Sequence, residues 1–67
     1  MTTLEVNGTP WEGPDGVTVA GLVAVWCPSP RGVAVARNGE VVSKSAWEAT
    51  VISEGDRIEI VTAAAGG

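Results

Sequence analysis

The sequence predicts an α+β fold in which one helix packs against a mixed sheet of four to five strands. Three observations indicate this class. Segments of alternating apolar and polar residues occur near both ends of the chain and in its middle, two Asn-Gly pairs mark tight turns, and one stretch has apolar residues at helical spacing. Strands therefore precede and follow a single helix, an order typical of a helix that covers one face of a sheet.

The first predicted hairpin begins close to the N-terminus. Residues 3–6 alternate between apolar and polar types, and residues 9–12 form the returning strand. Asn7-Gly8 between them favours a two-residue type I′ turn, because both residue types tolerate positive φ. The returning strand is expected at an edge of the sheet, because Pro10 has no N–H group to donate to a further neighbour.

The single helix is predicted between the turn cluster of residues 13–16 and the prolines Pro28 and Pro30. Thr18 is a suitable N-cap residue. Gly21 and the many valines give this segment weak helix propensity, so packing on the sheet must stabilise it. The residues at i, i+3, i+4 and i+7, which form the apolar stripe expected in the core, are Val19, Leu22, Val23 and Trp26.

The second half of the chain repeats the hairpin pattern. Residues 33–37 and 40–42 are strands around Asn38-Gly39, and Ser45 and Glu48 have the spacing of a capping box at one short helical turn. Residues 57–62 alternate again and form the last strand. Its side chains are expected to point alternately, with Ile58 and Ile60 toward the core and Arg57, Glu59 and Val61 outward.

The order of these elements predicts the ubiquitin-like β-grasp topology. The last strand is expected beside the first, in the centre of the sheet. Residues 1–62 then form one β-grasp domain, and residues 63–67 form a flexible C-terminal tail. Asp15 and Asp56 fall in Gly-containing turns and are interpreted as turn residues.

Size and composition argue against an autonomous enzyme. A chain of 67 residues buries only about 60% of its unfolded surface, so a deep catalytic cleft is hard to build. The chain has no histidine and one cysteine, Cys27, which excludes a His-activated nucleophile and a Cys-only zinc site. We therefore expect no bound cofactor, no metal and no catalytic residue, and we interpret Cys27 as structural.

Charge and hydropathy also limit the partners. The net charge is −4 and the basic residues are scattered, so nucleic acid is not an expected partner. The N-terminus lacks the basic region of a secretory signal, and the longest apolar stretch is too short for a membrane span. We expect a cytoplasmic monomer that does not bind membranes and that docks on other proteins.

The C-terminal segment Ala63-Ala64-Ala65-Gly66-Gly67 has the composition of a chemical substrate. Its side chains are methyl groups or hydrogens, so it can enter a narrow channel in a partner with its carboxylate unobstructed. A carboxylate is a poor electrophile, so a partner enzyme must activate Gly67 with ATP. Val61, six residues before the end, is the candidate docking residue, and Arg57 and Glu59 flank it on the same face. Trp11 and Trp47 are expected to be partly exposed and are further candidate contacts.

These features together resemble the ThiS family, the sulfur carriers of thiamine thiazole biosynthesis. The resemblance implies that an E1-like, ThiF-type adenylyltransferase uses ATP and Mg²⁺ to adenylate Gly67. It further implies that a persulfide donor such as a cysteine desulfurase supplies sulfur, and that the thiocarboxylate serves thiazole synthase. The segments that carry the resemblance are 6–8, 33–40, 45–47, 54–61 and Gly66-Gly67.

Three alternatives remain at this point. A MoaD-type carrier of molybdopterin synthesis, or a carrier for cysteine synthesis or tRNA thiolation, shares the fold and the tail chemistry, although MoaD-type chains tend to contain Phe, which is absent here. A ubiquitin-like modifier would join the same carboxylate to lysines, and could form chains on itself only through Lys44 or the N-terminus. A plain interaction module would not need its Gly-Gly end.

Overall fold

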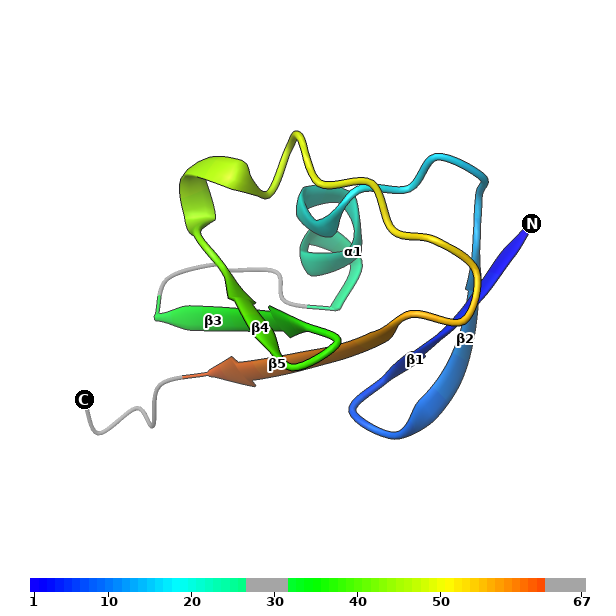
Figure 1. Ribbon diagram of the computed structural model, residues 1–67, viewed down its shortest axis with the longest axis horizontal. Helices are drawn as coiled ribbons and strands as arrows, with labels where there is room; N and C mark the ends of the chain where they lie inside the picture. Colours follow the sequence, from blue (N-terminus) through cyan, green and yellow to red (C-terminus); the bar gives the residue numbers. More distant parts are fainter. Residues whose placement is uncertain (27–31, 63–67) are drawn as a thin grey trace.

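The computed structural model describes residues 1–26 and 32–62 and contains a five-stranded sheet with one helix on one face (Figure 1). The predicted α+β, β-grasp fold is confirmed. A helix that could cross a membrane is not found among the described residues. The elements in chain order are β1 (Thr2–Val6), β2 (Thr9–Gly13), α1 (Val19–Trp26), β3 (Val33–Arg37), β4 (Glu40–Val42), the 3₁₀ turn η1 (Lys44–Ala46) and β5 (Arg57–Thr62).

The strand order is β2-β1-β5-β3-β4, so the last strand lies in the centre of the sheet as predicted. β5 runs parallel to β1 and antiparallel to β3. β2 is an edge strand, which accommodates Pro10. β5 is therefore fixed from both sides, and it ends on the side of the molecule opposite the N-terminus (Figure 1).

Both hairpins turn through Asn-Gly pairs in the predicted conformation. The φ angles are 52° and 82° for Asn7 and Gly8, and 52° and 87° for Asn38 and Gly39. Positive φ at both central residues defines the type I′ turn, which costs little for Asn and Gly but strains most other residues. The turns thereby set the register of each hairpin, pairing Val6 with Thr9 and Arg37 with Glu40.

The core lies between α1 and the inner face of the sheet. Thr18 caps the helix as predicted, because its Oγ1 accepts a hydrogen bond from the Gly21 N–H at 3.1 Å. The connection between β4 and β5 closes the core from the side with Ile52 and Trp47. The buried apolar residues are Leu4, Val6, Val19, Leu22, Val23, Val35, Trp47, Ile52, Ile58 and Ile60.

The tryptophans depart from the prediction at two of three positions. Trp26 was expected in the core but is 38% exposed, because it is the last residue of α1 and a large ring at the end of a short helix is incompletely covered. Trp47 was expected to be partly exposed but is 5% exposed, and its Nε1 donates to the Val42 carbonyl at 3.0 Å. Trp11 is half-buried as expected and lies over Gly13, where a Cβ would clash with the indole ring.

The short helical turn exists, but the predicted capping box at Ser45 and Glu48 is wrong. The turn begins at Lys44 with Ser43 as N-cap, and no side chain caps it. Burial of Trp47 and its bond to the Val42 carbonyl fix the turn two residues earlier than the local pattern indicates, with Ser43 rather than Ser45 as N-cap. The interpretations of Cys27, Pro28 and Pro30 concern residues outside the described ranges.

Candidate functional site

The predicted chemical end of the chain follows directly from the central strand. Ala63, Ala64, Ala65, Gly66 and Gly67 lie outside the described residues, so their predicted roles stay predictions. The structure does describe the strand that carries them, which ends at Thr62, opposite Val33 of β3. Residues 63–67 follow this anchored strand in the sequence.

The outward face of β5 carries the three contact residues predicted on that strand. Arg57, Glu59 and Val61 are exposed, and the intervening Ile58 and Ile60 are buried. Val61 is 62% exposed, which is high for a valine in a central strand. The structure thus brings the three candidates together on one surface that leads toward the C-terminus.

A larger apolar surface extends from Val61 across β3 to β4, and the sequence analysis did not identify it. Ala34 is the cross-strand partner of Val61, and Ala36 is the partner of Val41, which is 81% exposed. Cross-strand partners and residues two apart in a strand share one face. We call these four residues, Ala34, Ala36, Val41 and Val61, the outer patch. The I′ turn at Asn38-Gly39 fixes the register of Ala36 with Val41, so the sequence did contain the signal for half of this patch.

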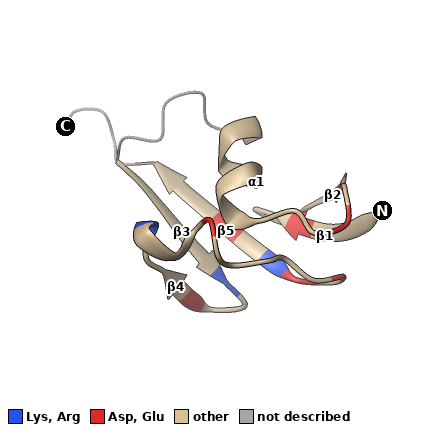
Figure 2. Cartoon of the chain, turned by 90° about the horizontal axis from the view of Figure 1, so that it is seen from above, with Lys and Arg blue, Asp and Glu red and all other residues tan. Residues whose placement is uncertain are grey.

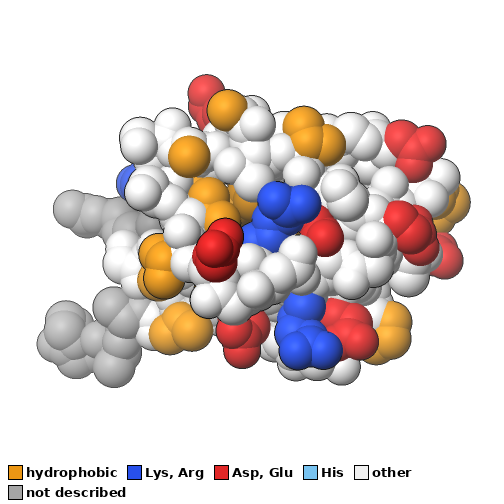
Figure 3. Space-filling model, viewed as in Figure 1, with side chains coloured by type: hydrophobic (Ala, Val, Ile, Leu, Met, Phe, Trp, Pro, Cys, Tyr) orange, Lys and Arg blue, Asp and Glu red, His pale blue; other side chains and the backbone are white. Residues whose placement is uncertain are grey.

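The opposite half of the same sheet face is charged. Arg57 lies beside Glu5 of β1, and Glu12 of β2 lies farther along the same face. Figure 2 shows that the charged residues of β5 occupy the first half of the strand. Figure 3, which views the molecule with the helix above the sheet, shows most of its hydrophobic side chains toward the side where β5 ends, and acidic side chains on both sides. The surface therefore combines an apolar area near the C-terminal end of β5 with a mainly acidic area behind it.

Asp56 is a turn residue, as the sequence indicates, because its N–H donates to the Ser53 carbonyl at 3.1 Å, but it also has a network of partners that the sequence analysis did not identify. Its carboxylate accepts hydrogen bonds from Arg37 Nε at 2.7 Å, Asn38 Nδ2 at 3.1 Å and the Ser53 N–H at 2.8 Å. Burial raises the pKa of Asp56, but the Ser53 N–H, the Arg37 guanidinium and the Asn38 amide outweigh it, and the pKa lies below its usual value. This network joins the β3–β4 turn to the start of β5 and so supports the strand that carries the tail.

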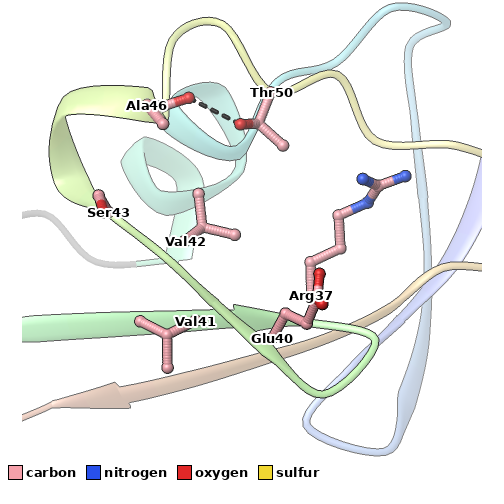
Figure 4. Close-up of a pocket in the computed structure, with 7 residues that line it drawn as sticks. All are labelled: Arg37, Glu40, Val41, Val42, Ser43, Ala46 and Thr50. Carbon is pink, nitrogen blue, oxygen red and sulfur yellow. Dashed lines mark hydrogen bonds between the residues drawn. The ribbon is translucent and has the colours of Figure 1, made fainter.

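A hollow of about 320 Å³ lies between β4 and η1 (Figure 4). Its polar groups are largely engaged, because Arg37 binds Asp56 and the Thr50 hydroxyl donates to the Ala46 carbonyl at 2.7 Å. No cluster of three or more potential metal ligands occurs among residues 1–26 and 32–62.

Comparison with known proteins identifies the family. The model of the ThiS family matches residues 4–67, which is nearly the whole chain and includes the Gly-Gly end. The chain belongs to the ThiS family. This family consists of sulfur carriers rather than catalysts, and its members act in thiamine biosynthesis.

Solved structures of the family have the same fold. The crystal structure of a thiamine biosynthesis protein (ThiS) from Geobacter metallireducens matches with a TM-score of 0.82 and 33% identity, covering 98% of this chain and 100% of that one. An NMR structure of a thiamine biosynthesis protein from the same organism matches with a TM-score of 0.81 and 32% identity, covering 98% and 88%. Both likenesses extend over nearly the whole chain.

One similar protein is much longer than this chain. A thiazole synthase from Magnetococcus marinus is 39% identical over 64 residues, which are 96% of this chain but only 20% of that protein. The chain therefore spans about a fifth of that relative. A ThiS-like segment can thus be part of the same polypeptide as a thiazole synthase.

Proposed function

We propose that this chain is a sulfur carrier whose Gly67 carboxylate is converted to a thiocarboxylate for formation of the thiazole ring of thiamine. The observation that carries the proposal is the match to the ThiS family, which extends through Gly66 and Gly67. The fold supports it, because the strand before this end is central and fixed on both sides. The domain then acts as a rigid handle for a reactive terminus.

The proposed chemistry proceeds in three steps on partner enzymes. A carboxylate oxygen of Gly67 attacks the α-phosphorus of ATP on a ThiF-type enzyme that uses Mg²⁺, and pyrophosphate leaves. The terminal sulfur of a persulfide, formed by a cysteine desulfurase or another donor, attacks the acyl carbon and AMP leaves, which gives an acyl disulfide. A thiol reductant then cleaves the S–S bond by supplying two electrons, and the thiocarboxylate is released.

Each step uses geometry that this chain supplies. Gly67 has no Cβ beside the reacting carbon, so an activating site can approach it closely. Binding energy from the folded domain holds the carboxylate near ATP, which lowers the entropic cost of a reaction between separate molecules. The chain itself contributes binding and delivery, and the partners contribute the catalytic groups.

The outer patch is the proposed docking surface for the activating enzyme. Val61 and Val41 are the most exposed valines of the sheet, and exposed apolar residues that form one surface mark partner sites. The adjacent acidic residues Glu5 and Glu59 favour a partner whose apolar surface has basic residues at its rim. Arg57 then opposes this attraction at one position and helps to set the orientation.

A thiazole synthase is the proposed acceptor of the sulfur. The relative from Magnetococcus marinus supports this, because a segment similar to this chain forms part of a protein named as thiazole synthase. Two domains that are linked in one polypeptide meet each other at a high effective concentration. The carriers of molybdopterin synthesis and of tRNA thiolation would deliver the same group to other acceptors.

The direct test is activation by the ThiF-type enzyme of the same host. We expect ATP–pyrophosphate exchange that depends on this chain, and complete loss of exchange after deletion of Gly66 and Gly67. The deletion variant should keep the tryptophan fluorescence and the unfolding midpoint of the unaltered chain, which would show that the loss of exchange is not caused by unfolding. Exchange that persists in the deletion variant would contradict the proposal and favour an interaction module.

A further inference from the structure

The two Asn-Gly turns have the same backbone conformation, but their asparagine side chains bind different ends of β5. Asn38 Oδ1 accepts from the Arg57 N–H at 2.9 Å, and Asn38 Nδ2 donates to Asp56. Asn7 Oδ1 accepts from the Ile60 N–H at 2.8 Å, and Asn7 Nδ2 donates to the Ile60 carbonyl at 3.2 Å. One turn therefore holds the first residue of β5, and the other holds a residue close to its last.

The Asn7 side chain takes the place of a missing strand residue. The β1 backbone pairs with β5 through the Glu5 N–H to the Asp56 carbonyl at 3.0 Å and the Asn7 N–H to the Ile58 carbonyl at 2.9 Å. The chain then turns away at Gly8. The next peptide groups of β5 that face β1 belong to Ile60, two residues on. An amide side chain has the donor and acceptor of a peptide group, so Asn7 extends the parallel pairing by one step.

Few residues can combine these two properties. The position requires a positive φ, which Asn and Gly adopt readily. Gly would keep the turn but has no side chain, and Asp would keep the acceptor but has no N–H for the Ile60 carbonyl. The side-chain bonds thus give this asparagine a role that the turn alone does not require.

We propose that Asn7 is a positioning residue that fixes the end of β5 and thereby the point from which the C-terminal residues extend toward a partner's active site. This inference rests on the proposed function as a carrier. Without the Asn7 amide, the peptide groups of Ile60 that face β1 lose both partners, and this end of β5 is held only by the pairing of its neighbours Glu59 and Val61 with β3. The end of β5 then separates from the sheet more often, and a partner must order more backbone when it binds the C-terminal residues.

The test compares Asn7→Gly with Asn38→Gly, which removes the same side chain from an identical turn at the other end of β5. Both variants keep residues that allow positive φ. Two readouts are needed: amide hydrogen exchange at Ile60, and the steady-state kinetics of ATP–pyrophosphate exchange with the host ThiF-type enzyme. The kinetics are measured at a temperature at which tryptophan fluorescence shows every variant to be fully folded.

We expect Asn7→Gly to speed exchange of the Ile60 amide about tenfold, because the Ile60 N–H loses its acceptor and the Ile60 carbonyl loses its donor. The KM for the carrier should rise about fivefold with kcat within about twofold, because ground-state ordering is affected rather than the chemical step. Asn7→Asp keeps the acceptor for the Ile60 N–H and loses the donor to the Ile60 carbonyl, so its KM should lie between that of the unaltered chain and that of Asn7→Gly. Asn38→Gly should leave KM unchanged within about twofold.

A purely structural role for Asn7 predicts a lower unfolding midpoint with unchanged KM under folded conditions. That result would overturn this inference and leave the proposed function intact. Equal KM increases in both Gly variants would overturn it as well, because the effect would then not depend on the end of β5. If the unaltered chain supports no ATP–pyrophosphate exchange at all, the proposed function fails, and the positioning role fails with it.

Discussion

The two faces of β5 differ in composition and in the role that we propose for each. Ile58 and Ile60 point into the core and are 0% and 8% exposed, whereas Arg57, Glu59 and Val61 alternate with them on the outer face. The inner residues pack against the rest of the domain. The outer residues contribute little to that packing, which leaves them available for a partner. We therefore expect stability and the proposed partner recognition to be separable on a single six-residue strand.

The largest expected effect is on the inner face. Ile58→Ala removes a fully buried side chain and should lower the free energy of unfolding by about 3–4 kcal/mol, through lost burial and the cavity left behind. This is a large share of the roughly 3–10 kcal/mol expected for a domain of this size. Urea unfolding monitored by tryptophan fluorescence measures it. Val61→Ala is the matched control and should stay within about 0.5 kcal/mol, and equal losses for both variants would contradict the division between the faces.

The second effect concerns the support of β5 at its start. Asp56→Ala leaves Arg37 without its carboxylate partner and the Ser53 N–H without its acceptor, so we expect a loss of about 2–3 kcal/mol. The pKa of Asp56 is lowered in the folded state, so its contribution is present above the ordinary Asp value of about 3.9 and disappears as the pH falls through the folded value. Unfolding measured from pH 7 down to pH 2 should therefore decline less steeply in the variant. A steeper decline of stability with falling pH in Asp56→Ala than in the unaltered chain would contradict a stabilising role for the hydrogen bonds of Asp56.

The third effect tests the outer face. Val61→Asp should weaken binding to the ThiF-type enzyme at least about tenfold, because it places a desolvated charge in an apolar contact, while stability changes by less than about 0.5 kcal/mol. Val41→Asp should behave alike if the outer patch acts as one surface. Val51→Asp is the control, because Val51 is 52% exposed but lies outside the sheet, bridged to Thr18. Equal weakening by all three, measured by calorimetric titration, would assign the effect to net charge.

The smallest effect lies on the helix that covers the inner face. Thr18→Ala removes the acceptor of the Gly21 N–H and should cost about 1 kcal/mol of unfolding free energy. Binding to the activating enzyme should not change, because Thr18 lies on the opposite side of the sheet from the outer patch. Reduced affinity in this variant, at full folding, would show that the helix side also contacts the partner.

Local patterns in the sequence were sufficient for most of the fold. The two Asn-Gly turns, the alternation in residues 57–62 and the cap at Thr18 each have a short-range physical cause, and all three were confirmed. The tryptophans were misplaced because their burial depends on which elements meet. Trp47 reaches the core from a connection, and Trp26 lies at the end of the helix that was expected to bury it.

The site was predictable where it follows from a single strand and not where it crosses strands. Arg57, Glu59 and Val61 were placed on one face by alternation alone, as the structure confirms. Ala34 and Val41 were missed because their proximity to Val61 depends on the register between three strands. Asp56 was read as a turn residue because its partner Arg37 is distant in sequence. Gly66 and Gly67 remain predictions from sequence and family.

The most direct test of the central claim is mass spectrometry of the C-terminal peptide after incubation with the host extract, ATP, Mg²⁺ and cysteine. Cleavage after Arg57 releases residues 58–67, which contain no methionine, so the replacement of oxygen by sulfur at Gly67 cannot be confused with oxidation of Met1. We predict an ATP-dependent mass gain of sulfur for oxygen confined to Gly67. An unmodified peptide, in an extract that modifies a known sulfur carrier added as a positive control, would contradict the account.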